Sequence, residues 1–122
     1  MTSVQNFSPE RGAQDGKEPE AGQGCTMDTL KEIAALATDT PFPMVIFGNT
    51  DRAVAAAEAL WLFARRTGLD APGECPRTVV QDLMANLMHL CAQEGITSEG
   101  MPFSSLVSMA EMHFEDEREN DL

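Results

Sequence analysis

Two histidines are the side chains of this sequence best suited to hold a metal ion or to move a proton. His89 and His113 lie in two segments with helical periodicity, and Asp82 precedes the first of them. A metal site on helices needs ligands at i, i+3 or i+4, or ligands that converge from separate elements. At a spacing of four residues, His113 with Glu117 is the single pair that includes a histidine. The pattern therefore predicts no metal ion, no cofactor and no catalytic residue.

Acidic residues are concentrated near the C-terminal end. Glu111, Glu115 and Glu119 recur every four residues, with Asp116 and Glu117 between them. On a helix this spacing places the three glutamates on one side, about 6 Å apart along the axis, similar to successive phosphates of a nucleic-acid strand. Like charges at this spacing repel, so either a solvated, frayed helix end or an acidic ridge facing a basic groove would explain them. We treat all five as candidate partner-binding residues, the partner being a protein with a basic groove.

The overall charge limits the classes of partner. Eight Lys and Arg residues against 20 Asp and Glu residues give a formal net charge of −12. Direct binding to DNA or RNA requires Lys and Arg to displace counterions, and an anionic membrane attracts basic segments. The charge therefore argues against nucleic acid and membrane as direct partners.

Other patterns indicate a cytoplasmic protein. No apolar run approaches the roughly 18 residues of a membrane span, and the N-terminal residues MTSVQNFSPE lack the basic start and apolar stretch of a secretory signal. Three widely spaced cysteines without a C-x-x-C pair favour reduced thiols. A glycine-rich phosphate loop, G-x-S-x-G and H-E-x-x-H are all missing from the sequence, so we expect a protein that is not an enzyme.

Four segments have the apolar periodicity of helices. The first spans residues 28–37 with Asp28 as its N-cap, and the second spans 51–67 with Thr50 as its N-cap. Gly68 ends the second as a left-handed cap. The short apolar run at residues 42–47 lacks a strand to pair with, so we expect an extended segment packed on the core.

The third and fourth helices are predicted at about 77–94 and 104–117, each with an apolar stripe that we expect to be buried. The two stripes are Val80, Leu83, Met84, Leu87 and Cys91, and then Phe103, Leu106, Val107, Ala110 and Phe114. The sequence thus predicts an all-α fold, a small bundle of three to four helices with a disordered N-terminal arm. We divide it into a Gly-rich acidic arm (1–27), a helical domain (28–117) and an acidic tail (118–122).

Large apolar side chains exceed what one thin core needs. Trp61, Phe63, Met84, Met88 and Met109 are the residues in question. An exposed Met-rich stripe suits a dimer or a partner helix. A homodimer, or more generally a helical homo-oligomeric assembly module, is therefore an alternative function.

The stretch VVQDLMANLMHLCAQEGI, followed by FSSLVSMAEMHFEDE, resembles a family of small helical proteins encoded by phages, plasmids and bacterial genomes. The pattern of that family is roughly D-L-x-x-D-L-x-H, then about a dozen residues, then F-x-x-L-x-x-x-A-x-x-H-[FY]-x-x-E. Residues 79–117 match it, with Asn86 in place of the usual Asp. The matching residues are Asp82, Leu83, Leu87, His89, Phe103, Leu106, Ala110, His113, Phe114 and Glu117. The resemblance implies a helical hairpin and an origin in a mobile element; the family has no assigned activity.

Three hypotheses follow. The first is a non-catalytic acidic binding protein of phage type that inhibits or adapts a host nucleic-acid-handling complex, in the manner of an anti-CRISPR or anti-restriction protein that mimics nucleic acid. The second is the helical assembly module. The third is a metal-dependent enzyme that uses Asp82, His89 and His113.

Overall fold

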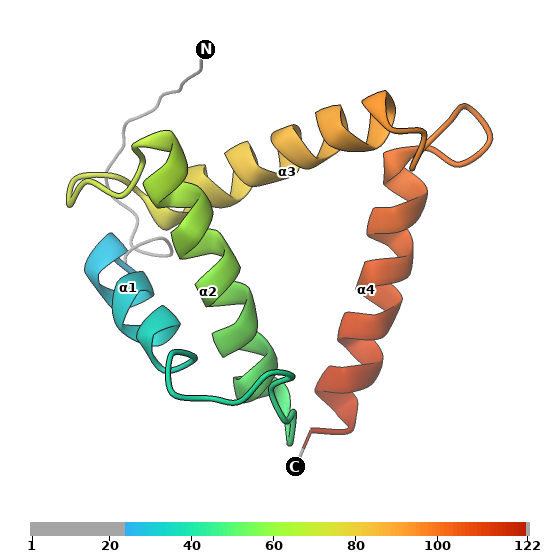
Figure 1. Ribbon diagram of the computed structural model, residues 1–122. Coiled ribbons are helices and arrows are strands. Elements are labelled where there is room, and N and C mark those ends of the chain that lie inside the picture. Colours follow the sequence, from blue (N-terminus) through green and yellow to red (C-terminus); the bar gives the residue numbers. More distant parts are fainter. Residues whose placement is uncertain (1–23, 122) are drawn as a thin grey trace.

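The computed structural model describes residues 24–121, and this part of the chain folds into four α-helices. They are α1 (Met27–Ala35), α2 (Asn49–Thr67), α3 (Pro76–Gln93) and α4 (Phe103–Glu119). In Figure 1, α1 lies beside α2, while α2, α3 and α4 form the three sides of an open triangle. The all-α fold predicted from the sequence is confirmed. The predicted disordered arm lies mostly outside the described residues.

The core lies where α1, α2 and the first turn of α3 meet. Met27 of α1 is 1% exposed, and Ala64 of α2 and Val79 of α3 are fully buried. The small side chains of α2 allow α1 to approach closely, and Leu60, Trp61 and Phe63 pack against this cluster from its edge. The buried position of Met27 corrects the predicted boundary, because the last residue assigned to the arm is a core residue.

The helix ends follow the expected chemistry, but at shifted positions. Thr26, rather than Asp28, caps α1: its hydroxyl accepts the backbone N–H of Thr29 at 3.1 Å. Gly48, rather than Thr50, is the N-cap of α2. In place of a capping hydroxyl, the Asp51 carboxylate accepts backbone N–H groups from the two residues before α2, at 2.7 and 3.3 Å.

Gly68 ends α2 in the left-handed conformation, with φ of 77°, as predicted. Its backbone N–H donates to the carbonyls of Ala64 and Arg65, which are among the last carbonyls of the helix and lack partners within it. The chain then turns through a short loop into α3, whose first residue is Pro76. A proline fits this position because the first N–H of a helix has no intrahelical partner.

The predicted burial of the two apolar stripes is largely wrong. In α3 Cys91 is buried, as predicted, and Val79, which lies outside the predicted stripe, is fully buried, whereas Val80, Met84 and Leu87 are about 40% exposed. In α4 the structure buries no residue, and Phe114 is 58% exposed. The reason is geometric: α3 packs on α2 only near its own N-terminal end, and α4 does not pack along any other helix (Figure 1).

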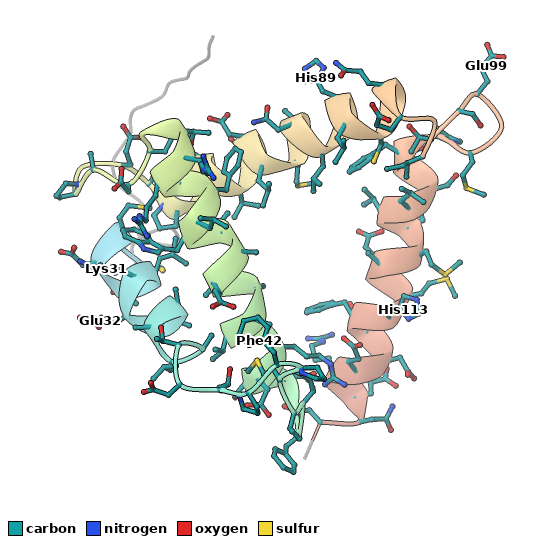
Figure 2. The ribbon with its side chains drawn as sticks, in the orientation of Figure 1. Lys31, Glu32, Phe42, His89, Glu99 and His113 are labelled. Atoms are coloured by element: carbon teal, nitrogen blue, oxygen red, sulfur yellow. The ribbon has the colours of Figure 1, made fainter. Side chains whose placement is uncertain are left out.

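Residues 42–47 are extended, as predicted, but they do not pack on the core. Phe42 is 93% exposed and Phe47 is 88% exposed. The segment passes around the end of α1 toward the start of α2, and no further helix packs over it there (Figure 2). At the other end of the chain, α4 extends to Glu119, so the predicted acidic tail begins within the helix. No helix of residues 24–121 has both the length and the apolar character required to cross a membrane.

Candidate interaction surfaces

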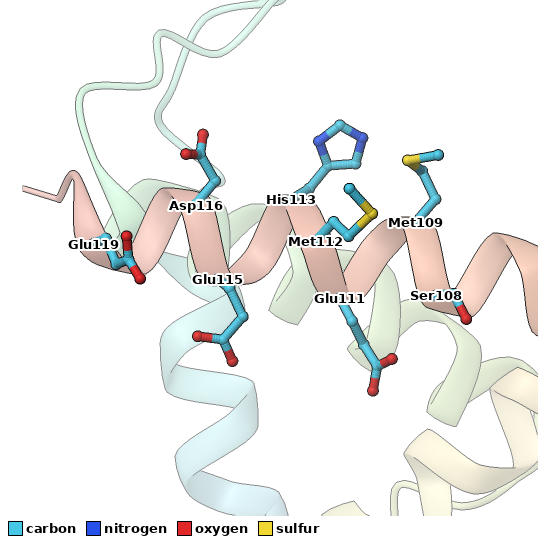
Figure 3. A pocket seen from close by; sticks show the side chains of 8 residues that line it. All are labelled: Ser108, Met109, Glu111, Met112, His113, Glu115, Asp116 and Glu119. Atoms are coloured by element: carbon cyan, nitrogen blue, oxygen red, sulfur yellow. The ribbon is translucent and has the colours of Figure 1, made fainter.

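One side of α4 carries the glutamates that the sequence places four residues apart. Glu111, Glu115 and Glu119 are all exposed, and Figure 3 shows Glu111 and Glu115 projecting to the same side of the helix. A step of four residues turns by roughly 40° and rises by about 6 Å, so the three carboxylates follow a slowly winding line. We call these three residues the acidic side.

The acidic side has one basic neighbour on its own helix. Arg118 donates to a carboxylate oxygen of Glu115 at 2.8 Å, with both side chains more than half exposed. An exposed ion pair of this kind contributes little to stability. Arg118 also lies in the last turn, where a positive charge suits the negative end of the helix dipole. The acidic side is therefore largely uncompensated.

The other two candidate acids point elsewhere. Asp116 lies on the side of α4 that carries His113 and Met109 (Figure 3). Its backbone carbonyl accepts the side-chain amide of Asn120 at 2.7 Å, at the C-terminal end of the helix. Glu117 turns toward α2, where its carboxylate lies 3.4 Å from Arg52 Nε. The five acids predicted as one binding set are therefore split between three directions.

Glu117 belongs to a polar contact that closes the open triangle. The side-chain amide of Asn49 donates to the Glu117 carbonyl at 3.0 Å, and the backbone N–H of Asn49 donates to Asp121 Oδ1 at 3.0 Å. Asp121 thus places a carboxylate at the N-terminus of α2, where the helix dipole favours negative charge. We call Asn49, Arg52, Glu117 and Asp121 the polar latch.

Sequence reasoning missed the polar latch. Its hydrogen-bond partners are 68 and 72 residues apart in the chain, and none of the four residues forms a recognisable motif. Gly48 takes part in the same contact in the structure, because a Cβ at that position would lie 2.8 Å from Asp121 Oδ1. The latch is polar, with Asn49 and Glu117 partly buried and Arg52 and Asp121 exposed, so it positions α4 without contributing a core.

The outer surface of α4 has a shallow depression of about 700 Å³. Its lining comes from α4 alone: Ser108, Met109, Glu111, Met112, His113, Glu115, Asp116 and Glu119 (Figure 3). Because no second element faces these side chains, the depression cannot enclose a small molecule. It can serve only as part of a flat surface for a larger partner.

An apolar groove lies on the other side of α4, where α3 and α4 meet. Its volume is about 460 Å³. The apolar residues that line it, which we call the inner face, are Met84, Leu87, Phe103, Leu106, Val107, Ala110 and Phe114. Glu111 lies at its edge, and the Arg118 guanidinium lies 5.7 Å from the centre of the Phe114 ring. No other helix of the described chain covers this face.

The structure separates the residues that the sequence grouped as an oligomer face. Met84 belongs to the inner face, and Met88 is half exposed on α3. Met109 lies on the outer surface of α4. Trp61 and Phe63 are partly buried against the core of α1 and α2. These five residues therefore do not form one continuous surface.

The histidines are not brought together. His89 on α3 and His113 on α4 are both exposed, and Figure 2 shows them well separated on outward-facing sides of the two helices. Asp82 is exposed on α3. Within residues 24–121, no group of three His, Cys, Asp or Glu side chains is arranged to hold a metal ion.

Comparisons with known proteins leave these surfaces to be interpreted on their own geometry. No family model, no curated protein and no solved structure matches the chain.

Proposed function

We propose that this protein is a non-catalytic binding protein that presents the acidic side of α4 to a basic groove on another protein. The observation that carries the proposal is the exposure of Glu111, Glu115 and Glu119 along a side of α4 that no described helix covers (Figure 3). These three carboxylates are exposed to water in the free chain. A basic surface can therefore attract and contact them without disrupting the core of the protein.

The partner class follows from the spacing and sign of the charge. Grooves lined with Lys and Arg are built to follow the phosphates of a nucleic-acid strand. Carboxylates at steps of about 6 Å along a rigid helix offer such a groove a similar row of negative charge. The net charge of −12 adds long-range steering, which raises the association rate at low salt.

The proposed role is to occupy the nucleic-acid groove of a host complex and so inhibit or adapt it, as an anti-CRISPR or anti-restriction protein would. A phage or other mobile element is the origin consistent with this role. The acids differ in their expected contributions: Glu117 is engaged by the polar latch and Asp116 faces another direction. Binding should therefore depend mainly on the acidic side.

The test compares two charge reversals of equal size. The variant E115K/E119K changes the acidic side, and the matched control E32K/E99K changes two exposed glutamates far from it (Figure 2). Both variants and the wild type are immobilised, exposed to host lysate treated with nuclease, and washed at increasing salt. A duplex oligonucleotide then serves as the competitor.

The expected result is a captured protein that duplex DNA displaces, that E115K/E119K loses, and that E32K/E99K retains. Retention should fall as salt rises, because exposed charges are screened beyond about 8–10 Å at physiological ionic strength. Capture that is equal in all three proteins, or that the control loses as fully as the acidic-side variant, would overturn the proposal.

A further inference from the structure

The inner face is an apolar surface that the fold of residues 24–121 leaves open. α4 has 17 residues and an apolar stripe from Phe103 to Phe114, yet none of its residues is buried. Phe114 is 58% exposed, and Met84 and Leu87 of α3 are 41% and 39% exposed. A contiguous apolar surface of this kind on a small protein marks a contact with another molecule.

Residues 24–121 have no further helix to place there. α1 is used by the core that it forms with α2, because Met27, Leu30 and Ala34 are buried in that cluster. The C-terminal end of α4 is fixed to the start of α2 by the polar latch. α4 meets α2 only at this end and α3 only at the other, so no helix of residues 24–121 packs along the length of α4 (Figure 1).

We propose that a second copy of this chain covers the inner face, and that the two inner faces pack against each other about a two-fold axis. In each copy the apolar stripes of α3 and α4 lie against no other helix of residues 24–121 along most of their length. A two-fold axis places the same apolar surface of the second copy opposite them.

The charge pattern favours this occupant. A chain of net charge −12 repels its own copy wherever acidic surfaces meet. The inner face limits this repulsion, because apolar side chains line the groove with Glu111 at its edge, and Arg118 lies over the ring of Phe114. Glu115 and Glu119 do not line the groove, so these two residues of the acidic side stay outside the contact.

The area also matches the requirement of a stable dimer. Phe103 and Phe114 would each bury roughly 150–250 Å² if fully covered, and the other five residues are smaller, so at their partial exposure the seven offer at most about 500 Å² of apolar surface. Since apolar atoms make up about 60% of an interface, the footprint reaches at most about 800 Å² for each copy, the value of a standard interface.

The test is the mass of the full chain in solution, measured by sedimentation equilibrium from about 1 to 100 µM. We expect a species of twice 13.2 kDa that dissociates on dilution. The variant A110E places a carboxylate on the inner face, and S108E adds the same charge to the outer surface of the same helix. Burying the unpaired charge of A110E should raise the dissociation constant at least about 100-fold, whereas S108E should leave it within a few-fold of the wild type.

Two further measurements keep the outcome decisive. Far-UV circular dichroism reports whether A110E retains its helices. If A110E loses them, L87E places a carboxylate on the inner face from α3 instead, and its dissociation constant is measured in the same way. The variant E115K/E119K should remain a dimer, which separates this inference from the proposed function. A wild type that is monomeric at 100 µM, or a dimer that persists unchanged in folded A110E and L87E, would overturn the proposal.

Discussion

Val79 and Val80 are neighbours on α3 that differ sharply in burial, and truncating each to alanine tests where the core of the free chain ends. Val79 is fully buried in the cluster of α1, α2 and α3, whereas Val80 is 42% exposed. Both substitutions remove the same atoms from the same helix. Any difference in stability therefore reports the difference in surroundings.

The expected magnitudes follow from the burial. Val79→Ala loses the transfer free energy of two methyl groups, about 0.8 kcal/mol each, and leaves a small cavity that adds about 1 kcal/mol. At both positions alanine, the better helix former, regains several tenths of a kcal/mol, so Val79→Ala should destabilise by about 2 kcal/mol. Val80→Ala loses only about half of the transfer term and leaves no cavity. Its net cost should be about 0.5 kcal/mol. For a domain of this size, 2 kcal/mol corresponds to a fall in Tm of roughly 8–16 °C.

The assay is denaturant unfolding followed by far-UV circular dichroism at low micromolar protein, where self-association contributes least. The slope of the transition should be the same for both variants and the wild type, so that the midpoints report stability alone. Equal losses for Val79→Ala and Val80→Ala at this concentration would refute the reasoning, because they would mean that the free chain buries both sides of α3.

Three further predictions concern single positions, each checked by thermal unfolding unless stated. Gly68→Ala should destabilise by about 1 kcal/mol, because an L residue is strained at a φ of 77°, while the control Gly73→Ala, which has open space around its Cβ, should be neutral or slightly stabilising. Thr26→Ala should cost about 1 kcal/mol by removing the cap of α1, and Thr26→Ser should restore most of it. Gly48→Ala should displace the Asp121 carboxylate, because the new Cβ would meet it. Hydrogen exchange in the last turn of α4 should then become faster, and no amide of α1 should exchange more slowly. Unchanged exchange in the last turn of α4 would contradict the role given to the latch.

The sequence by itself determined the helices of the described chain and the glycine that ends α2, but not the residues that cap α1 and α2 at their N-termini. The recurrence of apolar residues at 3 and 4 positions is a local property, and it placed α2, α3 and α4 within one or two residues of their observed bounds. Gly68 was identified because only glycine adopts a left-handed cap without strain. The exposure of Glu111, Glu115 and Glu119 on one side of α4 also followed from helical spacing alone.

Only the tertiary structure decided which apolar stripes are covered. Periodicity shows which side of a helix is apolar, but not whether another element lies against it, so the pattern assigned Phe114 to a buried stripe and left out Val79, which is the buried residue. The position of α4 depends on the contact of Asn49 with Glu117 and Asp121 across about 70 residues of chain. No local rule relates residues at that separation, because they come into contact only after the helices between them have packed in their final orientations.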